Sequence, residues 1–341
     1  MMSDSDEPVG PAITPTQTLP HQGGGLHSTA NKAVIVAGPT ASGKSALAVA
    51  IAETFDGVVI NADSMQVYDG LRVLTARPTA EDEARVPHRL YGILSPLELC
   101  SAGRWCALAA AACEEAWRTG KLPVVVGGTG LYLKALMEGL SPIPDVPDAV
   151  RQETRDRFAA LGNAAFHAAL AEIDPRMAAR LHPGNSQRLM RAWEVLAGTG
   201  RSLADWQDEP PLAPIAARFF TMALLPERER LYAQCDGRFL AMLEQGALEE
   251  VRVLTARSLD PDLPALRALG VSELAQHLRG ELSLTDAVAA AQQATRRYAK
   301  RQMTWFRHQL SADFSLSTQL SESLQGKIFA NIRHFLLTGT E

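Results

Sequence analysis

The chain has 341 residues, of which 46% are hydrophobic and 21% are charged, and its formal net charge is −5. These values fit one large α/β domain with a smaller one, and they exclude a protein that binds polyanions through overall positive charge. No apolar run is long enough to span a membrane, and the four cysteines form no C-x-x-C pair. We therefore expect a cytoplasmic protein with reduced thiols and no membrane partner.

Residues 1–31 differ in composition from the rest of the chain. They are rich in proline, glycine and acidic residues and contain few side chains that would form a core. This composition predicts a disordered N-terminal tail. The segment also lacks the basic stretch and apolar run of a secretion signal.

A predicted strand at residues 33–37 leads into the pattern G-x-x-x-x-G-K-S. In such a phosphate-binding loop, backbone N–H groups point at phosphate oxygens, Lys44 adds positive charge and the Ser45 hydroxyl reaches Mg²⁺. The helix predicted at residues 44–55 directs the positive end of its dipole at the same place. The expected diphosphate or nucleotide contacts are Gly38, Pro39, Thr40, Ala41, Ser42, Gly43, Lys44 and Ser45. The loop therefore predicts a phosphate-bearing ligand, but it does not specify the reaction.

Strands and helices alternate along the following segment. A second strand is predicted at residues 57–61, a turn-rich region at 66–98, a helix at 101–118 and a third strand at 122–126. This alternation predicts right-handed crossovers and a parallel sheet. The expected fold class is α/β, a P-loop NTPase-like parallel sheet flanked by helices.

The pattern changes at a cluster of prolines between residues 142 and 147. Residues 148–206 contain no evident strand and predict an all-helical insertion domain. A strand at 222–226 is expected to rejoin the sheet, followed after Glu227 only by helices, including a long one at about 286–309. The expected division is a first part of the core at 32–145, the insertion at 146–206, a second part of the core at 207–320 and a C-terminal tail at 321–341.

A carboxylate is expected beside the phosphate-binding loop, because Asp63 follows the strand at 57–61. Parallel α/β sheets bind ligands at the carboxyl ends of their strands. The strand at 122–126 ends instead in Gly127, Gly128 and Thr129, where P-loop enzymes commonly place an acid that holds Mg²⁺. Two roles are open for Asp63: a metal ligand, or a general base for a nucleophile that attacks next to the phosphates.

Several motifs then occur in one order along the chain. They are Gly38–Ser45, Asp63–Tyr68, Pro87–Leu90, Gly127–Tyr132, Pro183–Val195 and Arg296–Arg307. Together they resemble the bacterial tRNA dimethylallyltransferases, the tRNA isopentenyltransferase family, over residues 33–310. The resemblance implies transfer of a dimethylallyl group from dimethylallyl diphosphate to the exocyclic N6 amine of the adenosine at tRNA position 37, beside the anticodon, with Mg²⁺ as cofactor. The products would be N6-dimethylallyladenosine and diphosphate.

The resemblance also implies roles for individual residues. Asp63 would be the general base, Thr129 would orient the reacting groups, and Lys44 would neutralise the leaving diphosphate. Arg238 would be a further diphosphate contact. The implied tRNA contacts are Asp63, Ser64, Met65, Gln66, Thr129, Arg151, Gln187, Arg188, Leu189, Met190, Arg191, Arg267 and Gly270. Val271 and Ser272 depart from the family pattern, so no role is carried over to them.

Two basic stretches offer independent support for an RNA partner. Residues 151–191 contain seven arginines against four acids, and Arg and Gln suit contacts to phosphates and base edges of an exposed RNA loop. Residues 296–308 contain no acid and place Arg297, Lys300 and Arg301 on one helix face. A solvated helix face explains the first stretch equally simply, and packing beside the core explains the second.

The motifs are also compatible with three alternative functions: prenylation of free adenine nucleotides, a P-loop kinase, and a nucleotide-binding module without activity. The helical insertion favours RNA over a free nucleotide, which needs no such extension. The missing acid after Val126 disfavours the kinase, and the presence of Lys44, Ser45, Asp63 and Thr129 disfavours the inactive module. We expect a monomer that binds the anticodon stem-loop of tRNA.

Overall fold

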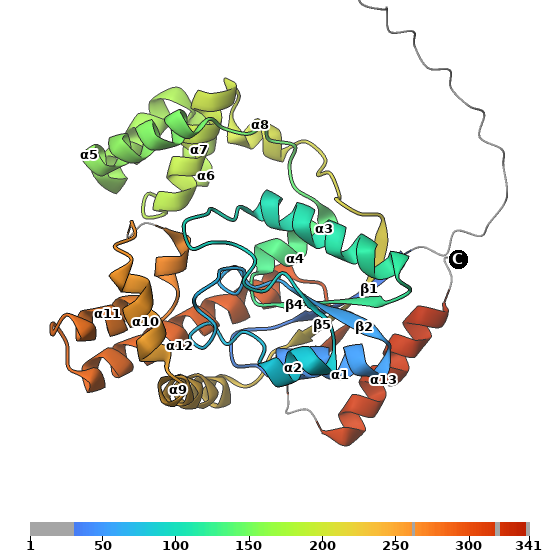
Figure 1. Cartoon of the computed structure of the whole chain (residues 1–341). Helices are drawn as coiled ribbons and strands as arrows, with labels where there is room; N and C mark the ends of the chain where they lie inside the picture. The colour runs from blue at the N-terminus through green and yellow to red at the C-terminus, as the bar shows by residue number, and fades with distance from the viewer. Residues whose placement is uncertain (1–30, 261–262, 318–320, 339–341) are drawn as a thin grey trace, which may run out of the picture.

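A computed structural model describes residues 31–260, 263–317 and 321–338 of the chain. They contain a six-stranded sheet in the order β3-β2-β4-β1-β5-β6, in which neighbouring strands run parallel (Figure 1). The strands are β1 Asn31–Ala37, β2 Gly57–Asn61, β3 His88–Arg89, β4 Leu122–Gly127, β5 Ala217–Leu224 and β6 Phe314–Leu316. The predicted parallel α/β fold is confirmed. The expected N-terminal tail lies outside the described residues except for Asn31, which begins β1.

The central strand β1 explains why the sequence contains an uninterrupted apolar run before the loop. It pairs with β4 on one side and β5 on the other. Residues Ala33 to Ala37 are completely buried, because helices cover both faces of a parallel sheet and leave no solvent-facing side.

Two layers of helices cover the sheet (Figure 1). Helices α3 (Ala102–Arg118) and α4 (Gly130–Glu138) pack on the face that carries Ile35, whereas α1 (Lys44–Thr54) packs on the face that carries Val34 and Val36. A short helix, α2 (Ala80–Arg85), precedes β3. Because alternate residues of β1 point to opposite faces, one strand contributes to both apolar clusters.

The C-terminal segment, expected only as a tail, contains helix α13 (Glu322–Leu337). Its buried residues Ile328, Ile332 and Phe335 pack on the same face as α1. Lys32 on β1 donates to the backbone carbonyls of Leu336 and Thr338, both at 2.8 Å, and so satisfies acceptors that the helix end leaves open. The spacing of the three apolar residues by four and three is the sequence signal for this packed helix.

The helical insertion forms a lobe of its own beside the sheet (Figure 1). Its helices are α5 Asp148–Ile173, α6 Pro175–Arg180, α7 Ser186–Thr199 and α8 Leu203–Gln207. They enclose a separate apolar cluster that includes Phe166, Leu170 and Val195. The chain enters and leaves the lobe at one place, where Leu140 and Leu212 form a bridge. The structure therefore agrees with the prediction of an all-helical insertion.

The remaining helices lie beside the carboxyl ends of the strands. They are α9 Arg228–Glu244, α10 Ala247–Ala256, α11 Val271–Leu278 and α12 Leu284–Gln309, with a 3₁₀ turn at Pro264–Arg267. The expectation of helices alone after Glu227 is wrong, because β6 pairs with β5. This edge strand has three residues, too few to show a repeating pattern, and its place is fixed by the Asp313 carboxylate, which accepts from the Thr221 N–H at 2.7 Å. No helix within the described ranges is long and apolar enough to cross a membrane.

The ends of β2 and β4 approach each other unusually closely. Ala62 donates its N–H to Val126 O at 2.7 Å, and its carbonyl accepts from the Thr129 N–H at 3.2 Å. A Cβ atom added to Gly127 would lie 2.1 Å from the Ala62 carbonyl oxygen. Only glycine fits at this position without moving the backbone that precedes Asp63.

We predict that Gly127→Ala destabilises the protein by roughly 3 kcal/mol or more, because the clash is with backbone and cannot be relieved by a side-chain rotation. Urea or thermal unfolding measures the loss. Gly326→Ala is the matched control: Gly326 lies inside α13 with nothing within 4 Å of an added Cβ. That change should stabilise the helix by about 0.5–1 kcal/mol. Equal stability of the two variants would contradict the packing argument.

Candidate active site

The phosphate-binding loop connects β1 to α1. Ala41 and Gly43 both have positive φ, at 62° and 86°, and turn the backbone sharply before α1 begins at Lys44. The first N–H groups of this helix have no partner within it, and they face the loop together with the positive end of the dipole. The Lys44 ammonium donates to the Pro39 carbonyl at 3.2 Å. The loop therefore has the geometry predicted for binding an anion.

A cavity of about 260 Å³ lies between this loop and helices α9 and α12. Its polar lining includes Thr40, Asp63, Ser64, Arg238, Arg267 and Tyr298. Its apolar lining includes Met65, Leu74, Phe239, Met242, Ala268 and Leu269. The fold thus brings the predicted carboxylate and the predicted diphosphate contact Arg238 into one space, with an apolar wall beside them.

Asp63 and Thr129 are held in neighbouring turns. One carboxylate oxygen of Asp63 accepts from the Met65 N–H at 2.9 Å. The Thr129 hydroxyl accepts from the Ser64 N–H at 2.9 Å and donates to the Ser64 hydroxyl at 3.3 Å. The two predicted catalytic side chains are therefore connected through Ser64 and share the carboxyl edge of the sheet.

Two cations lie close to this carboxylate. Burial lowers the pKa of the Lys44 ammonium to about 8, although the charge of Asp63 opposes that shift, and Arg238 adds to it by repulsion. Burial likewise lowers the pKa of the Arg238 guanidinium, against the influence of Cys235 and Asp63. Arg238 also donates a hydrogen bond to the Thr40 hydroxyl. Desolvated positive charges of this kind interact strongly with an arriving anion.

Gln302 on α12 is a structural link that sequence reasoning missed. Its side-chain oxygen accepts from the Thr40 N–H at 2.8 Å, and its amide donates to the Gly128 carbonyl at 2.8 Å. The buried amide therefore ties the phosphate-binding loop to the turn after β4. The sequence gives no signal for these two hydrogen bonds, because Gln302 is a single polar residue beside the apolar Met303 and Phe306 and forms no recognisable motif.

Tyr298 of the same helix is a further cavity residue to which the sequence analysis assigns no role. It lines the cavity, and burial raises the pKa of its phenol, so the group remains protonated beside Asp63. The ring thus presents a neutral hydroxyl to the cavity rather than a charge.

A family model described as IPP transferase matches residues 66–309, and one described as isopentenyl transferase matches residues 31–98. The chain belongs to the IPP transferase family. A tRNA dimethylallyltransferase of Paramagnetospirillum magneticum is 62% identical over 313 residues, which cover 92% of this chain and 99% of the relative. The resemblance seen in the sequence motifs is confirmed.

Solved structures of this family have the same fold. A tRNA isopentenylpyrophosphate transferase from Bacillus halodurans matches with a TM-score of 0.64 and 33% identity, over 90% of this chain and 97% of that one. The structure of a eukaryotic dimethylallyltransferase acting on tRNA matches with a TM-score of 0.75 and 25% identity, over 91% of this chain and 81% of that one.

The residues expected to contact tRNA in this family member occupy several surfaces. On α7 of the lobe, Gln187 and Arg188 are exposed, Met190 and Arg191 are half-buried, and Arg191 pairs with Glu194 at 3.6 Å. Leu189 lies between them in sequence, but its side chain is fully buried in the core of the lobe. It can support this surface but cannot form part of it. Leu189 is buried while its sequence neighbours are not, because consecutive residues of a helix point in different directions.

The other expected tRNA contacts lie nearer the core. Arg151, at the start of α5, donates from Nε to the Val146 carbonyl at 3.1 Å. Gln66 uses its amide to donate to the carbonyls of Thr75 and Ala76, at 2.9 and 3.0 Å, and so fixes the loop that carries Leu74. Arg267 lines the cavity. Gly270 has φ of 90° and packs so closely on Phe239 that an added Cβ would lie 2.8 Å from its ring.

The second basic stretch lies on the exposed side of α12. Arg297, Lys300, Arg301 and Thr304 line a groove there together with Trp305. The opposite side of the helix buries Ala299, Met303 and Phe306. The buried face confirms the packing interpretation of this stretch. That the exposed basic face contacts RNA phosphates stays a prediction.

Ser45 is the predicted metal ligand. It is exposed on the first turn of α1 and lines a small cavity of about 170 Å³ with Gln66, Asp82 and His88. Within the described part of the chain, no three His, Cys, Asp or Glu side chains form a cluster that could hold a metal ion. The exposed Ser45 hydroxyl fits a Mg²⁺ that takes this one ligand from the protein and its other ligands from phosphate oxygens and water, as the ion commonly does.

We predict that the affinity for dimethylallyl diphosphate falls as the pH rises through about 8, because Lys44 loses its proton there. Below this pH the charged ammonium contributes fully, and between about pH 7.5 and 9 the loss should reach roughly tenfold. Calorimetric titration without tRNA, at fixed Mg²⁺, measures it. The control is Lys44→Arg, which keeps its charge over this range and should bind independently of pH. A flat profile for the unmodified protein would contradict the assignment.

Proposed function

We propose that this member of the IPP transferase family transfers a dimethylallyl group from dimethylallyl diphosphate to the N6 amine of adenosine 37 in tRNA. The observation that carries the proposal is the cavity beside the phosphate-binding loop, which combines Arg238, Asp63 and an apolar wall. A phosphate site alone fits many reactions. A carboxylate and apolar side chains next to it fit a prenyl diphosphate and an acceptor that must lose a proton.

The phosphate-binding loop supports this function by holding the leaving group. As the bond between C1 of the dimethylallyl group and oxygen breaks, its electron pair departs with diphosphate and negative charge grows on that oxygen. Lys44 and Arg238 lie where they can neutralise it. Mg²⁺ bound at Ser45 would add further positive charge on the diphosphate oxygens.

Asp63 supports the other half of the reaction. The exocyclic amine of adenine is a weak nucleophile, so attack of N6 on C1 is helped when a base removes the N6 proton. The Asp63 carboxylate lines the same cavity and accepts that proton in our proposal. Thr129, linked to it through Ser64, would orient the adenine.

The helical lobe favours a tRNA acceptor over a free adenine nucleotide. The lobe adds a surface apart from the cavity, on which Gln187 and Arg188 are exposed. A free nucleotide bound in the cavity does not need this additional surface. An adenosine within an anticodon loop must leave its stack to enter a pocket. One chain contains both the cavity and the lobe, which supports a monomer, and its four free cysteines suit the cytoplasm.

We predict that the protein moves label from dimethylallyl diphosphate to an unmodified anticodon stem-loop. Label that moves to AMP but not to the stem-loop would contradict the tRNA proposal.

We predict that Arg188→Gln weakens binding of the stem-loop. The slope of log affinity against log salt should become shallower by about one, as for the loss of one phosphate contact. The control is Arg333→Gln on α13, an equal charge change on the helix that packs with α1. A salt dependence of binding that is unchanged in Arg188→Gln would show that Arg188 is not part of the RNA interface.

We predict that Asp63→Asn lowers kcat about a hundredfold or more, since the amide keeps the shape of the carboxylate but cannot accept the proton. Turnover of labelled stem-loop under saturating substrates measures the change. Asp56→Asn is the matched control, because Asp56 is an exposed carboxylate just before β2, at the opposite end of that strand. Near-normal turnover of Asp63→Asn would show that proton removal does not depend on this residue.

A further inference from the structure

The last residue of β2, Asn61, is a polar side chain with no exposed surface. It immediately precedes Ala62 and Asp63, at the carboxyl edge of the sheet where the cavity lies. A buried amide is costly unless its donors and acceptor are paired. The partners of Asn61 therefore indicate what the side chain does there.

The side chain of Asn61 holds Asp63 by its backbone. Its oxygen Oδ1 accepts from the Asp63 N–H at 2.8 Å, and its nitrogen Nδ2 donates to the Asp63 carbonyl at 3.0 Å. The second hydrogen of Nδ2 points to the Leu90 carbonyl, also at 3.0 Å. Both peptide groups that flank the Asp63 Cα are thus fixed. When these two planes are fixed, so are φ, ψ and the direction of the Cα–Cβ bond.

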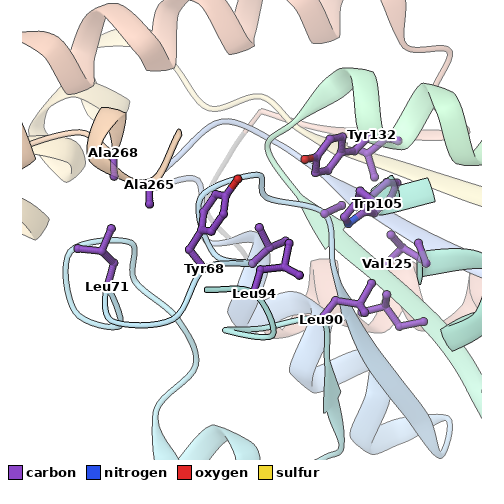
Figure 2. Close-up of a cluster of buried hydrophobic side chains, with 14 of the residues drawn as sticks. Tyr68, Leu71, Leu90, Leu94, Trp105, Val125, Tyr132, Ala265 and Ala268 are labelled. Carbon is purple, nitrogen blue, oxygen red and sulfur yellow. The ribbon is translucent and has the colours of Figure 1, made fainter. Parts of the chain in front are cut away.

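Asn61 is itself anchored from a third direction. Its backbone carbonyl accepts from the Trp105 indole N–H at 2.9 Å. The Trp105 ring stacks on Tyr132 with 4.5 Å between centroids and 10° between planes, and Figure 2 shows the two rings side by side at the edge of the buried cluster that contains Leu90. Helices α3 and α4 and the segment after β3 therefore all contribute to the position of this one amide.

We propose that Asn61 is a positioning residue that sets the direction in which the Asp63 carboxylate enters the cavity. Within the described residues, the carboxylate itself accepts a backbone hydrogen bond from the Met65 N–H, a contact inside the same turn, so its direction follows from the turn that Asn61 closes. This inference rests on the proposed role of Asp63 as the base. Misplacement of a reacting group by about 1 Å costs on the order of a hundredfold in rate.

A primary amide is the side chain that fits these three partners. It offers one acceptor and two donors at the end of a short stem. Alanine leaves one N–H and two carbonyls of the backbone without partners, whereas serine retains a hydroxyl that can pair with only part of the set. Alanine therefore removes all three hydrogen bonds of the Asn61 side chain, and serine removes only some of them.

The test is a double-mutant cycle between Asn61 and Asp63. Asn61→Ala should lower kcat about 10- to 100-fold in the otherwise unmodified protein, with KM for dimethylallyl diphosphate within about threefold, because the phosphate site is untouched. In the Asp63→Asn protein the same change should lower kcat less than about twofold, since no base remains to be positioned. Asn61→Ser should fall between the unmodified protein and Asn61→Ala.

Thr221→Ala is the control for a general loss of stability, because Thr221 is another buried polar residue of the sheet, in the middle of β5. It should leave kcat within about twofold even if the melting temperature falls as far as in Asn61→Ala. An equal loss from Asn61→Ala in both backgrounds would overturn the positioning role while leaving Asp63 as the base. Near-normal turnover of Asp63→Asn would overturn both. If Asn61→Ala fails to fold, Asn61→Ser in the two backgrounds gives the same comparison.

Discussion

The contact between the backbone at Ala62 and Gly127 is the constraint on which the rest of the site depends. Because no side chain separates the two strand ends, Ala62 can accept the Thr129 N–H and place the turn of Asp63 directly against the turn of Thr129. The Ser64 bonds to Thr129 then become possible. Main-chain contact thus brings together the two turns that carry the acid and the hydroxyl, and the buried Asn61 side chain holds the backbone of Asp63 within its turn.

A third segment joins at the same point. Gln302 reaches Gly128 with its amide and Thr40 with its oxygen, so α12 connects the phosphate-binding loop to the turn after β4. The opposite side of that helix carries the basic groove lined by Arg297, Lys300 and Arg301. A single helix thus borders both the phosphate site and an exposed basic surface. The two cations of the site, Lys44 and Arg238, are partly desolvated before any substrate arrives, which prepares the cavity for a multiply charged anion.

Local patterns made much of this structure predictable. The loop at residues 38–45, the buried strands and the long helix α12 follow from residues that are neighbours in sequence. The carboxylate Asp63 was found because it follows a strand. Gln302 was missed because its partner Thr40 is 262 positions away, and β6 because an edge strand of three residues shows no period. Leu189 was assigned to a surface because the family motif is continuous, whereas a helix sends consecutive side chains in different directions. The identity of the acceptor came from the family resemblance rather than from any residue pattern.

Helix α13 has a consequence for how the protein is made. It covers the apolar face that carries Val34 and Val36, and Lys32 of the first strand holds its end. During synthesis β1 leaves the ribosome long before α13 does, so this face has no cover from α13 for most of translation. Exposed apolar sheet surface promotes aggregation of incomplete chains. A premature stop before α13 would therefore yield a protein with an intact active-site sequence and an exposed apolar sheet face. We expect cellular quality control to degrade such a protein.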